Sequence, residues 1–368
     1  MNRVMAYKIS DTAMIIESDG KAILIADEAY YEGTLNIGST LKDLPSDYFT
    51  DYFPDAVFQG TTSGYNSGGQ GAPPYPTSVT NVIDKFPFSS DANATDVGDL
   101  SAVGWAHVAG QSSANNGYTS GGKTQGAGPP YGDPINTIDK FPFSSDGNAS
   151  DIADLSEARS QGAGQSSIAD GKGYTSGGAK VPPPSSDVID KFPFSSDANA
   201  TDVGNLTIHS YSHGGHSSTT DGYTAGGSTV GPPYTRGNVI DNFPFASDAN
   251  ATDVGDLLGP VLQCTSSQSS TTHGYVCGGQ PFASFTDVIQ KFPFSSNGNA
   301  TDVGDLTQGR SFAGGQTSTA SGYASGGQTP PSLAKTNVID KFPFSSDANA
   351  TDVGDMTVAR NYSAGQQV

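Results

Sequence analysis

The chain has 368 residues, a net charge of −20, 47 Gly and 23 Pro, and only 15% of its residues are charged. Such an acidic chain repels phosphate backbones, which argues against nucleic acid as a partner. No apolar run is long enough for membrane insertion. The two cysteines, Cys264 and Cys277, are too few for a disulfide framework. They fall on adjacent expected strands, so a local bridge and two separate thiols both stay open.

Residues 1–54 lack the pattern that fills the rest of the chain. Two apolar runs, 13–16 and 22–25, flank Asp19-Gly20, which predicts a β-hairpin because Asp-Gly favours a tight turn between strands. The segment is too small for a large core of its own. The start of the chain also lacks the apolar stretch of a secretory signal. We therefore expect a small N-terminal β extension that attaches to other subunits, in a protein made in a cytoplasm.

From residue 55 onward one motif, Phe-Pro-Phe-Ser-Ser-Asp in its first copy, recurs six times. Its first Phe is Phe86, Phe141, Phe192, Phe243, Phe292 or Phe342, so the intervals are 55, 51, 51, 49 and 50 residues. A Gly-Tyr landmark ending in a Gly pair precedes each copy, and its copies begin at Gly64, Gly117, Gly173, Gly222, Gly274 and Gly322. A fixed period of this size indicates a repeat array, a solenoid or a propeller.

Each unit divides into four expected strands. In the third unit they cover 159–167, 173–178, 187–194 and a stretch that ends near Leu206, with a turn at 197–200. Pro193 removes a ladder donor, which suggests that the third strand lies near the outside of a narrow sheet. Six such units can bury their faces by packing around an axis. We therefore expect an all-β, six-bladed β-propeller over residues 55–368.

The two ends of the repeat region complement each other. Residues 357–368 match 307–316, an expected first strand, whereas the first unit begins almost directly at its second strand. The C-terminal strand is therefore expected to complete the first blade and close the ring.

The order of residues within a unit resembles a Kelch-type propeller. Arg310, Gln316, Tyr323, the pair Gly326-Gly327 and Phe342 follow the Kelch order of a basic residue, an inner strand, a Tyr, a Gly pair and an aromatic strand end. The Kelch Trp is missing, and Phe-Pro-Phe is expected to fill its space. The amino-acid sequence of the repeat and that of residues 5–12 also resemble fibre and appendage proteins of marine tailed phages. That resemblance implies a virion protein, made in the host cytoplasm, that contacts other virion proteins through residues 1–54 and forms an oligomer.

The candidates for chemistry have structural alternatives that we favour. His107, His209, His213, His216 and His273 share no repeat position, so surface or channel histidines are favoured over a metal site. The Asp91–Asp96 turn has oxygen-bearing residues at alternate positions, as calcium loops do, but an Asx-stabilised turn is favoured. The repeated Asp84 is expected to bond neighbouring hydroxyls or backbone amides. No nucleophile–base arrangement or phosphate loop is visible, so we expect no enzyme activity, no metal and no cofactor.

In an up-and-down blade the 2–3 and 4–1 connections share one face. These connections vary between units, and function concentrates in loops on a rigid scaffold. Aromatic side chains there suit sugar binding, although they can equally pack each loop on its neighbour. The candidate binding residues are Trp105, Tyr75, Tyr131, Tyr211, Tyr234, Phe282, Arg159 and Arg310. We expect a tail fibre or appendage that binds host-surface glycan or another receptor; the alternative is an architectural virion subunit, such as a decoration or adaptor protein.

Overall fold

The computed structural model describes residues 59–71, 79–101, 108–124, 132–182, 184–229, 237–261, 266–281 and 284–368, together with three strands near the N-terminus. Its contacts divide the chain into two units, Met1–Pro54 and Asp55–Val368. No helix in the described part is long and apolar enough to cross a membrane.

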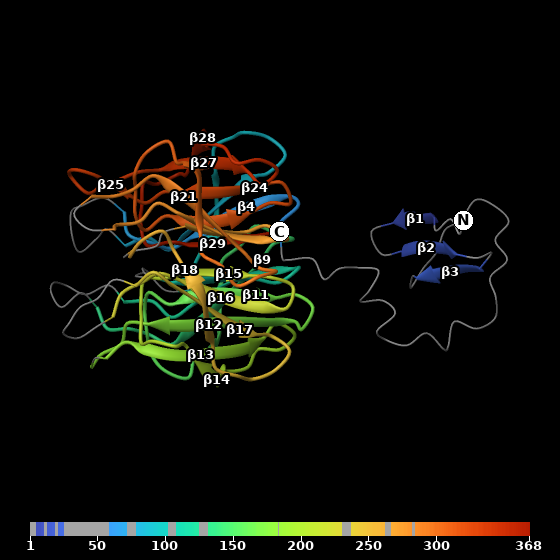
Figure 1. Ribbon diagram of the computed structural model, residues 1–368, viewed down its shortest axis with the longest axis horizontal. Helices are drawn as coiled ribbons and strands as arrows, with labels where there is room; N and C mark the ends of the chain where they lie inside the picture. The colour runs from blue at the N-terminus through green and yellow to red at the C-terminus, as the bar shows by residue number, and fades with distance from the viewer. Residues whose placement is uncertain are drawn as a thin grey trace. The chain divides into compact units, whose positions relative to one another are not determined.

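The second unit is a ring of six four-stranded antiparallel sheets, a six-bladed β-propeller (Figure 1). Blade 1 contains β29 (Ala364–Gln367), β4 (Ser63–Ser67), β5 (Val82–Pro87) and β6 (Thr95–Asp99). Blade 2 contains β7 (Ala109–Ser112), β8 (Asn116–Ser120), β9 (Thr137–Pro142) and β10 (Ser150–Asp154). Blade 3 contains β11 (Ala163–Ser167), β12 (Lys172–Gly178), β13 (Ser186–Pro193) and β14 (Thr201–Asn205).

The other three blades repeat this order. Blade 4 contains β15 (Gly214–Ser217), β16 (Asp221–Ala225), β17 (Val239–Pro244) and β18 (Thr252–Asp256). Blade 5 contains β19 (Ser266–Ser269), β20 (His273–Cys277), β21 (Val288–Pro293) and β22 (Thr301–Asp305). Blade 6 contains β23 (Gly314–Thr317), β24 (Ser321–Ser325), β27 (Val338–Pro343) and β28 (Thr351–Asp355), and its 2–3 loop adds the short pair β25 (Gln328–Thr329) and β26 (Ala334–Lys335).

The C-terminal strand closes the ring, as the sequence predicts. In blade 1 the innermost strand β29 pairs with β4, with Gly365 opposite Asn66 and Gln366 opposite Tyr65. The main-chain N–H groups of Thr61, Thr62 and Ser63 also donate to the Val368 oxygen. The first and last strands of the propeller therefore belong to one sheet, although they stand at opposite ends of the colour scale (Figure 1).

The third strand of each blade lies next to the outermost strand, near the outside of the sheet as the sequence predicts. It is an internal strand, because β13 lies between β12 and β14. Pro193 stands at its last position, opposite Lys172, and the pairing with β14 stops earlier, at Lys191. The donor that proline lacks is therefore not needed for the ladder.

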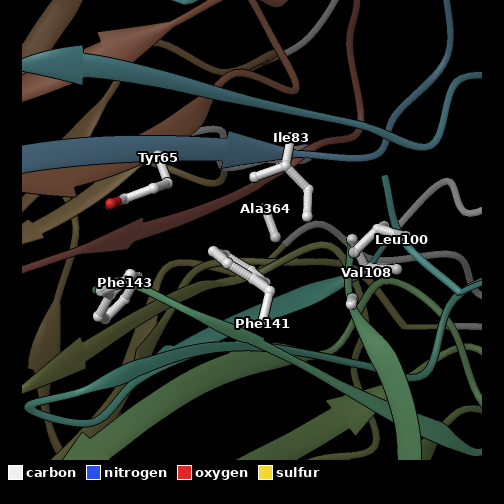
Figure 2. Packing of buried hydrophobic residues seen from close by; sticks show 8 residues of the cluster. Tyr65, Ile83, Leu100, Val108, Phe141, Phe143 and Ala364 are labelled. Atoms are coloured by element: carbon white, nitrogen blue, oxygen red, sulfur yellow. The ribbon is translucent and has the colours of Figure 1, made fainter. Parts of the chain in front are cut away.

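The core of the propeller lies between blades. Tyr65 of blade 1 packs on Phe141 and Phe143 of blade 2, with ring centroids 5.7 and 4.8 Å apart (Figure 2). The same Tyr and Phe-Pro-Phe contact recurs at every junction around the ring, for example between Tyr323 and Phe88. Phe-Pro-Phe thus supplies the aromatic bulk of the interblade core.

The glycine of the Gly-Tyr landmark is required by this packing. A Cβ added to Gly173 would lie 2.4 Å from the ring of Phe192, its cross-strand partner on β13. The equivalent glycines meet the equivalent Phe rings in the other blades. The glycine of the landmark is therefore needed because a phenylalanine ring packs directly against its backbone, where a side chain would clash.

In the first unit, three antiparallel strands are described: β1 (Met5–Ser10), β2 (Ala13–Ser18) and β3 (Lys21–Ile25), in the order β1-β2-β3. The β2–β3 hairpin is the one that the sequence predicts, whereas β1 was not expected.

Candidate functional site

The repeated Asp of the third strand fastens neighbouring blades together. Asp84 on β5 is fully buried and accepts hydrogen bonds from the N–H (3.1 Å) and the hydroxyl (2.6 Å) of Thr357, the second residue after β28 of blade 6. Arg360 donates to the same carboxylate at 3.1 Å. The predicted structural role of this Asp is therefore confirmed.

Arg159 and Arg310 occupy the same position as Arg360 and correct the sequence interpretation. They were expected as ligand contacts in the 4–1 loops, but their side chains are only 1% exposed. Arg159 pairs with Asp190 at 2.8 Å, and Arg310 pairs with Asp340. Both guanidinium groups are thus committed to holding adjacent blades. The first strand also begins later than expected, at Ala163 instead of Arg159.

The 3–4 turn carries a second interblade fastening, which we call the asparagine clasp. Asn93 Oδ1 accepts the N–H of Asp355 at 3.1 Å, while the N–H of Ala94 donates to the Asp355 oxygen at 2.8 Å. The equivalent pair recurs at all six junctions. Asp96 Oδ1 in addition accepts the N–H of Gly98, two residues on. The Asx hydrogen bonds of this turn are thereby confirmed, and no group of three potential metal-ligating side chains occurs among the described residues.

Two further side chains connect blades. Lys85 pairs with Asp146 of the next blade at 3.1 Å, and four other Lys–Asp pairs occupy equivalent junctions. Gln111 Nε2 on the innermost strand β7 donates to the main-chain oxygen of Tyr174 in the next blade at 2.9 Å. Five blades share this Gln–Tyr bond. The side chains that are repeated in the sequence therefore make contacts between blades.

The innermost strands surround a narrow central channel. At its middle level a Cβ on Gly110 would lie 2.4 Å from the Gly365 oxygen, and one on Gly164 would lie 2.1 Å from the Gly110 oxygen. Five of the six equivalent positions are glycine, which lacks the Cβ that would clash here, and Ser267 occupies the sixth. The cavities on either side of this level have volumes of about 60 and 100 Å³.

The smaller cavity, on the side of the 1–2 turns, is lined by a closed ring of hydrogen bonds. Each innermost strand donates a main-chain N–H to a side-chain oxygen on the strand of the next blade, at 3.0 to 3.3 Å. In order around the axis the six residues are Ser112, Ser166, Ser217, Ser269, Thr317 and Gln367. This ring satisfies the inward N–H groups that a sheet edge would otherwise leave unpaired.

The opposite channel mouth lies at the centre of the face that carries the 2–3 loops. Four residues that precede the innermost strands have positive φ there, namely Gln161 (60°), Ser212 (58°), Phe312 (60°) and Tyr362 (59°). This conformation is unfavourable for bulky side chains. The ring centroids of Phe312 and Tyr362 lie 3.8 Å apart, and the main-chain N–H of Tyr362 donates to the main-chain oxygen of Phe312.

Of the predicted loop residues, one more falls in the described part. Tyr211 is half-buried on this same face, and its main chain pairs with Ser228 of the 2–3 loop. Trp105, Tyr75, Tyr131, Tyr234 and Phe282 lie outside the described residues, as do Cys264 and His107. The Cys277 thiol is buried and donates to Gln268 Oε1 at 3.1 Å.

The positive-φ residues at the mouth escaped the sequence analysis because Gln, Ser, Phe and Tyr share no chemistry. Their common signal is position, two residues after Arg159, Ser210, Arg310 or Arg360.

Two buried histidines of blade 4 line the channel cavities. Burial lowers the pKa of His213 to about 3, with Arg159 adding to the effect, and lowers that of His216 to about 4. Both rings are therefore neutral at physiological pH. They are channel residues, one of the two alternatives favoured from the sequence.

No protein-family model matches the chain, and no curated protein matches it.

Proposed function

We propose that this chain is a non-enzymatic recognition scaffold, a phage tail fibre or appendage protein, whose 2–3 and 4–1 loop face binds host-surface glycan. The observation that carries the proposal is the division of labour within the repeat. The repeated Asp, Asn, Lys and Gln are used between blades, while side-chain identity varies at the channel mouth on the loop face.

The backbone at the mouth adds to this support. Positive φ in Phe312 and Tyr362 costs of order 1–3 kcal/mol each. Strained non-glycine residues concentrate at ligand-binding sites. The half-buried Tyr362, whose ring packs on the buried Phe312, is a rigid aromatic side chain of the kind that binds with little loss of side-chain entropy.

The first described residues of the propeller contact the face opposite these loops. Gly60 N–H donates to the Thr317 oxygen at 2.8 Å, and Gln59 Nε2 donates to the Ser269 oxygen at 3.4 Å. Residues 59 and 60 therefore join the propeller beside the 1–2 turns. These contacts leave the loop face uncovered by the described residues 59 and 60, so that face is suited to present a binding surface.

A second candidate, an architectural virion subunit such as a decoration or adaptor protein, is favoured by the N-terminal sheet. Its described strands form one sheet in the order β1-β2-β3, in which β1 and β3 are the edges. Edges of this kind add strands from other chains. In this alternative the variable loops contact virion proteins instead of a receptor.

A glycan array probed with the full-length protein separates the two candidates. We expect binding that is lost in Gln161→Ala and Tyr362→Ala, both half-buried at the mouth, and retained in Ser90→Ala and Ser196→Ala, which alter exposed residues of 3–4 turns. Thermal unfolding of each variant confirms that the ring is intact. No binding to any glycan, or equal losses in both pairs of variants, would count against the glycan proposal.

A further inference from the structure

The junction between blades 4 and 5 differs from the other five, and we call it the 4/5 seam. Its first departure is in the charged pairs. Asn242 replaces the repeated Lys of blade 4, and Asn297 replaces the Asp with which that Lys would pair. Both partners of one ion pair are thus neutral at the same junction, whereas Lys191–Asp248 and Lys291–Asp347 are kept on either side.

The buried Asp and its hydroxyl-bearing partner, which the other five junctions keep and which an Arg joins at three of them, are also replaced together. At the 5/6 junction Arg310, Asp340 and Thr307 form this group, with the Thr307 hydroxyl 2.7 Å from the carboxylate. At the 4/5 seam the equivalent residues are Val261, Gln290 and Leu258. There the Leu258 N–H donates to Gln290 Oε1 at 2.8 Å, which keeps the main-chain bond of the group but not its hydroxyl or guanidinium contacts.

The third departure is in the innermost strand. His216 takes the place of the repeated Gln, so the side chain that would donate to the Tyr275 oxygen is a histidine ring. Its Nδ1 lies 3.1 Å from the Gln268 oxygen and its ring lies edge-on to Phe292, while Nε2 is buried and has no hydrogen-bond partner among the described residues. The seam keeps the asparagine clasp of Asn299 and the Tyr223–Phe294 stack.

From these three coincident departures we propose that the closed ring opens first at the 4/5 seam, and that acid promotes this opening through His216. A ring of six blades can open without unfolding any blade, since each sheet carries its own ladder. The junction with the fewest polar fastenings is the one that separates at the lowest free energy.

The surroundings of His216 make it responsive to protonation. The elements packed on it provide no carboxylate in contact with the ring and supply these titratable groups: Asp221 and Tyr223 on β16, His273, Tyr275 and Cys277 on β20, and Lys291 on β21. Lys291 is paired with Asp347, and the hydroxyl of Thr220 donates to Asp221. β11 and β19 contribute no charged group. A proton on His216 in the closed ring therefore has no counter-charge, and opening exposes the ring to water.

Native-state hydrogen exchange of the full-length protein tests this proposal, because all six junctions carry the same reporter. The N–H of Ala300 donates to the Asp256 oxygen across the 4/5 seam, and Ala350, Ala251, Ala200, Ala149 and Ala94 occupy the same position at the other junctions. Exchange is measured at pH 7.5 and pH 5 and corrected for intrinsic chemical rates.

We expect Ala300 to be the least protected of the six at both pH values. With a closed-state pKa of about 4 and an ordinary value of about 6.5 after opening, its opening equilibrium should rise about 30-fold between pH 7.5 and 5. Equal protection at all six junctions, or an acid response shared by all six, would overturn the proposal.

Two variants test the role of the histidine. His216→Gln restores the residue used in the other five blades and should remove the acid response at Ala300. Gln165→His transfers the departure to the 3/4 junction and should create an acid response at Ala251. His213→Ala is the matched control, because His213 packs at the 3/4 junction beside Gly177; it should leave Ala300 unchanged. If the variants do not fold, the six-junction comparison in the unaltered protein still decides the proposal.

Discussion

Gln316 on β23 donates from Nε2 to the main-chain oxygen of Tyr65 on β4 at 2.9 Å, across 251 residues of sequence. The same bond joins consecutive blades at four other junctions, so the contact that closes the ring is chemically identical to those that build it. Closure therefore uses no special device beyond placing the C-terminal strand in the first blade.

Removal of residues 357–368 should strongly destabilise the propeller. The truncation deletes β29 and leaves the buried Asp84 without Arg360 and Thr357. Breaking a buried ion pair alone costs about 3–5 kcal/mol. We expect a lower urea midpoint and a less cooperative transition, measured by tyrosine fluorescence. Val358→Ala, in the same segment but exposed, serves as the control; an unchanged midpoint in the truncated chain would contradict closure by β29.

Gly173→Ala should be far more harmful than Gly147→Ala. The new Cβ at 173 would lie 2.4 Å from the Phe192 ring, whereas nothing lies within 4 Å at 147. Overpacking of this kind typically costs about 1–3 kcal/mol. Urea unfolding of the two variants measures the difference. Equal stabilities would show that the Phe ring moves aside without loss.

Replacement of the Arg310 group should be non-additive. Arg310→Val alone leaves Asp340 buried without its cation and should cost about 3–5 kcal/mol. The triple change Arg310→Val, Asp340→Gln and Thr307→Leu imports the set found at the 4/5 seam and should recover most of that loss. A double-mutant-cycle analysis of urea midpoints gives the coupling. If the triple variant is no more stable than Arg310→Val alone, the three residues act independently and the prediction is wrong.

Stability should fall as the pH is lowered from 7 to 5. His213 and His216 have folded-state pKa values of about 3 and 4, below the ordinary value near 6.5. Their contribution to the free energy of unfolding is fully present above pH 6.5. It is lost below pH 6.5, because the unfolded state then takes up protons, and the loss is about 2 kcal/mol per histidine at pH 5. Burial raises the pKa of Asp139 and Asp241, so their contribution is present at low pH and is lost as the pH rises through their folded values.

Comparison of variants at each pH isolates the histidine effect. His213→Ala introduces the residue found at the equivalent position Ala313 and should flatten the pH dependence of the free energy of unfolding, measured by urea unfolding at pH 5 and 7. An equal change in the free energy of unfolding between pH 5 and 7 in the variant and the unaltered protein would mean that other groups control the acid response.

The fold was largely predictable because each repeat states its own strands and turns. The Phe-Pro-Phe period, the Gly-Tyr landmark and the match of residues 357–368 to a first strand predict six blades and their closure, and the structure shows both. Arg159 and Arg310 were misinterpreted because a guanidinium group in a loop and one buried against an Asp look alike in sequence. Their partners Asp190 and Asp340 are about 30 residues away and were interpreted separately.

The site was less predictable for a different reason. The channel mouth is built by one residue from each of several blades, and positive φ at Gln161, Ser212, Phe312 and Tyr362 leaves no mark on residue type. The 4/5 seam was visible in part, since the losses at Asn242 and Gln290 stand out from the repeat. Asn242 belongs to blade 4 and Gln290 to blade 5, so only the structure shows that both lie at the same junction.

The proposed function makes the 2–3 and 4–1 loop face the recognition surface. Cryo-electron microscopy of the assembled particle that contains this chain tests it most directly. We predict that the channel mouth formed by Gln161, Ser212, Phe312 and Tyr362 faces solvent and is not covered by another subunit. A mouth buried in a subunit interface would contradict the claim and would favour the architectural alternative.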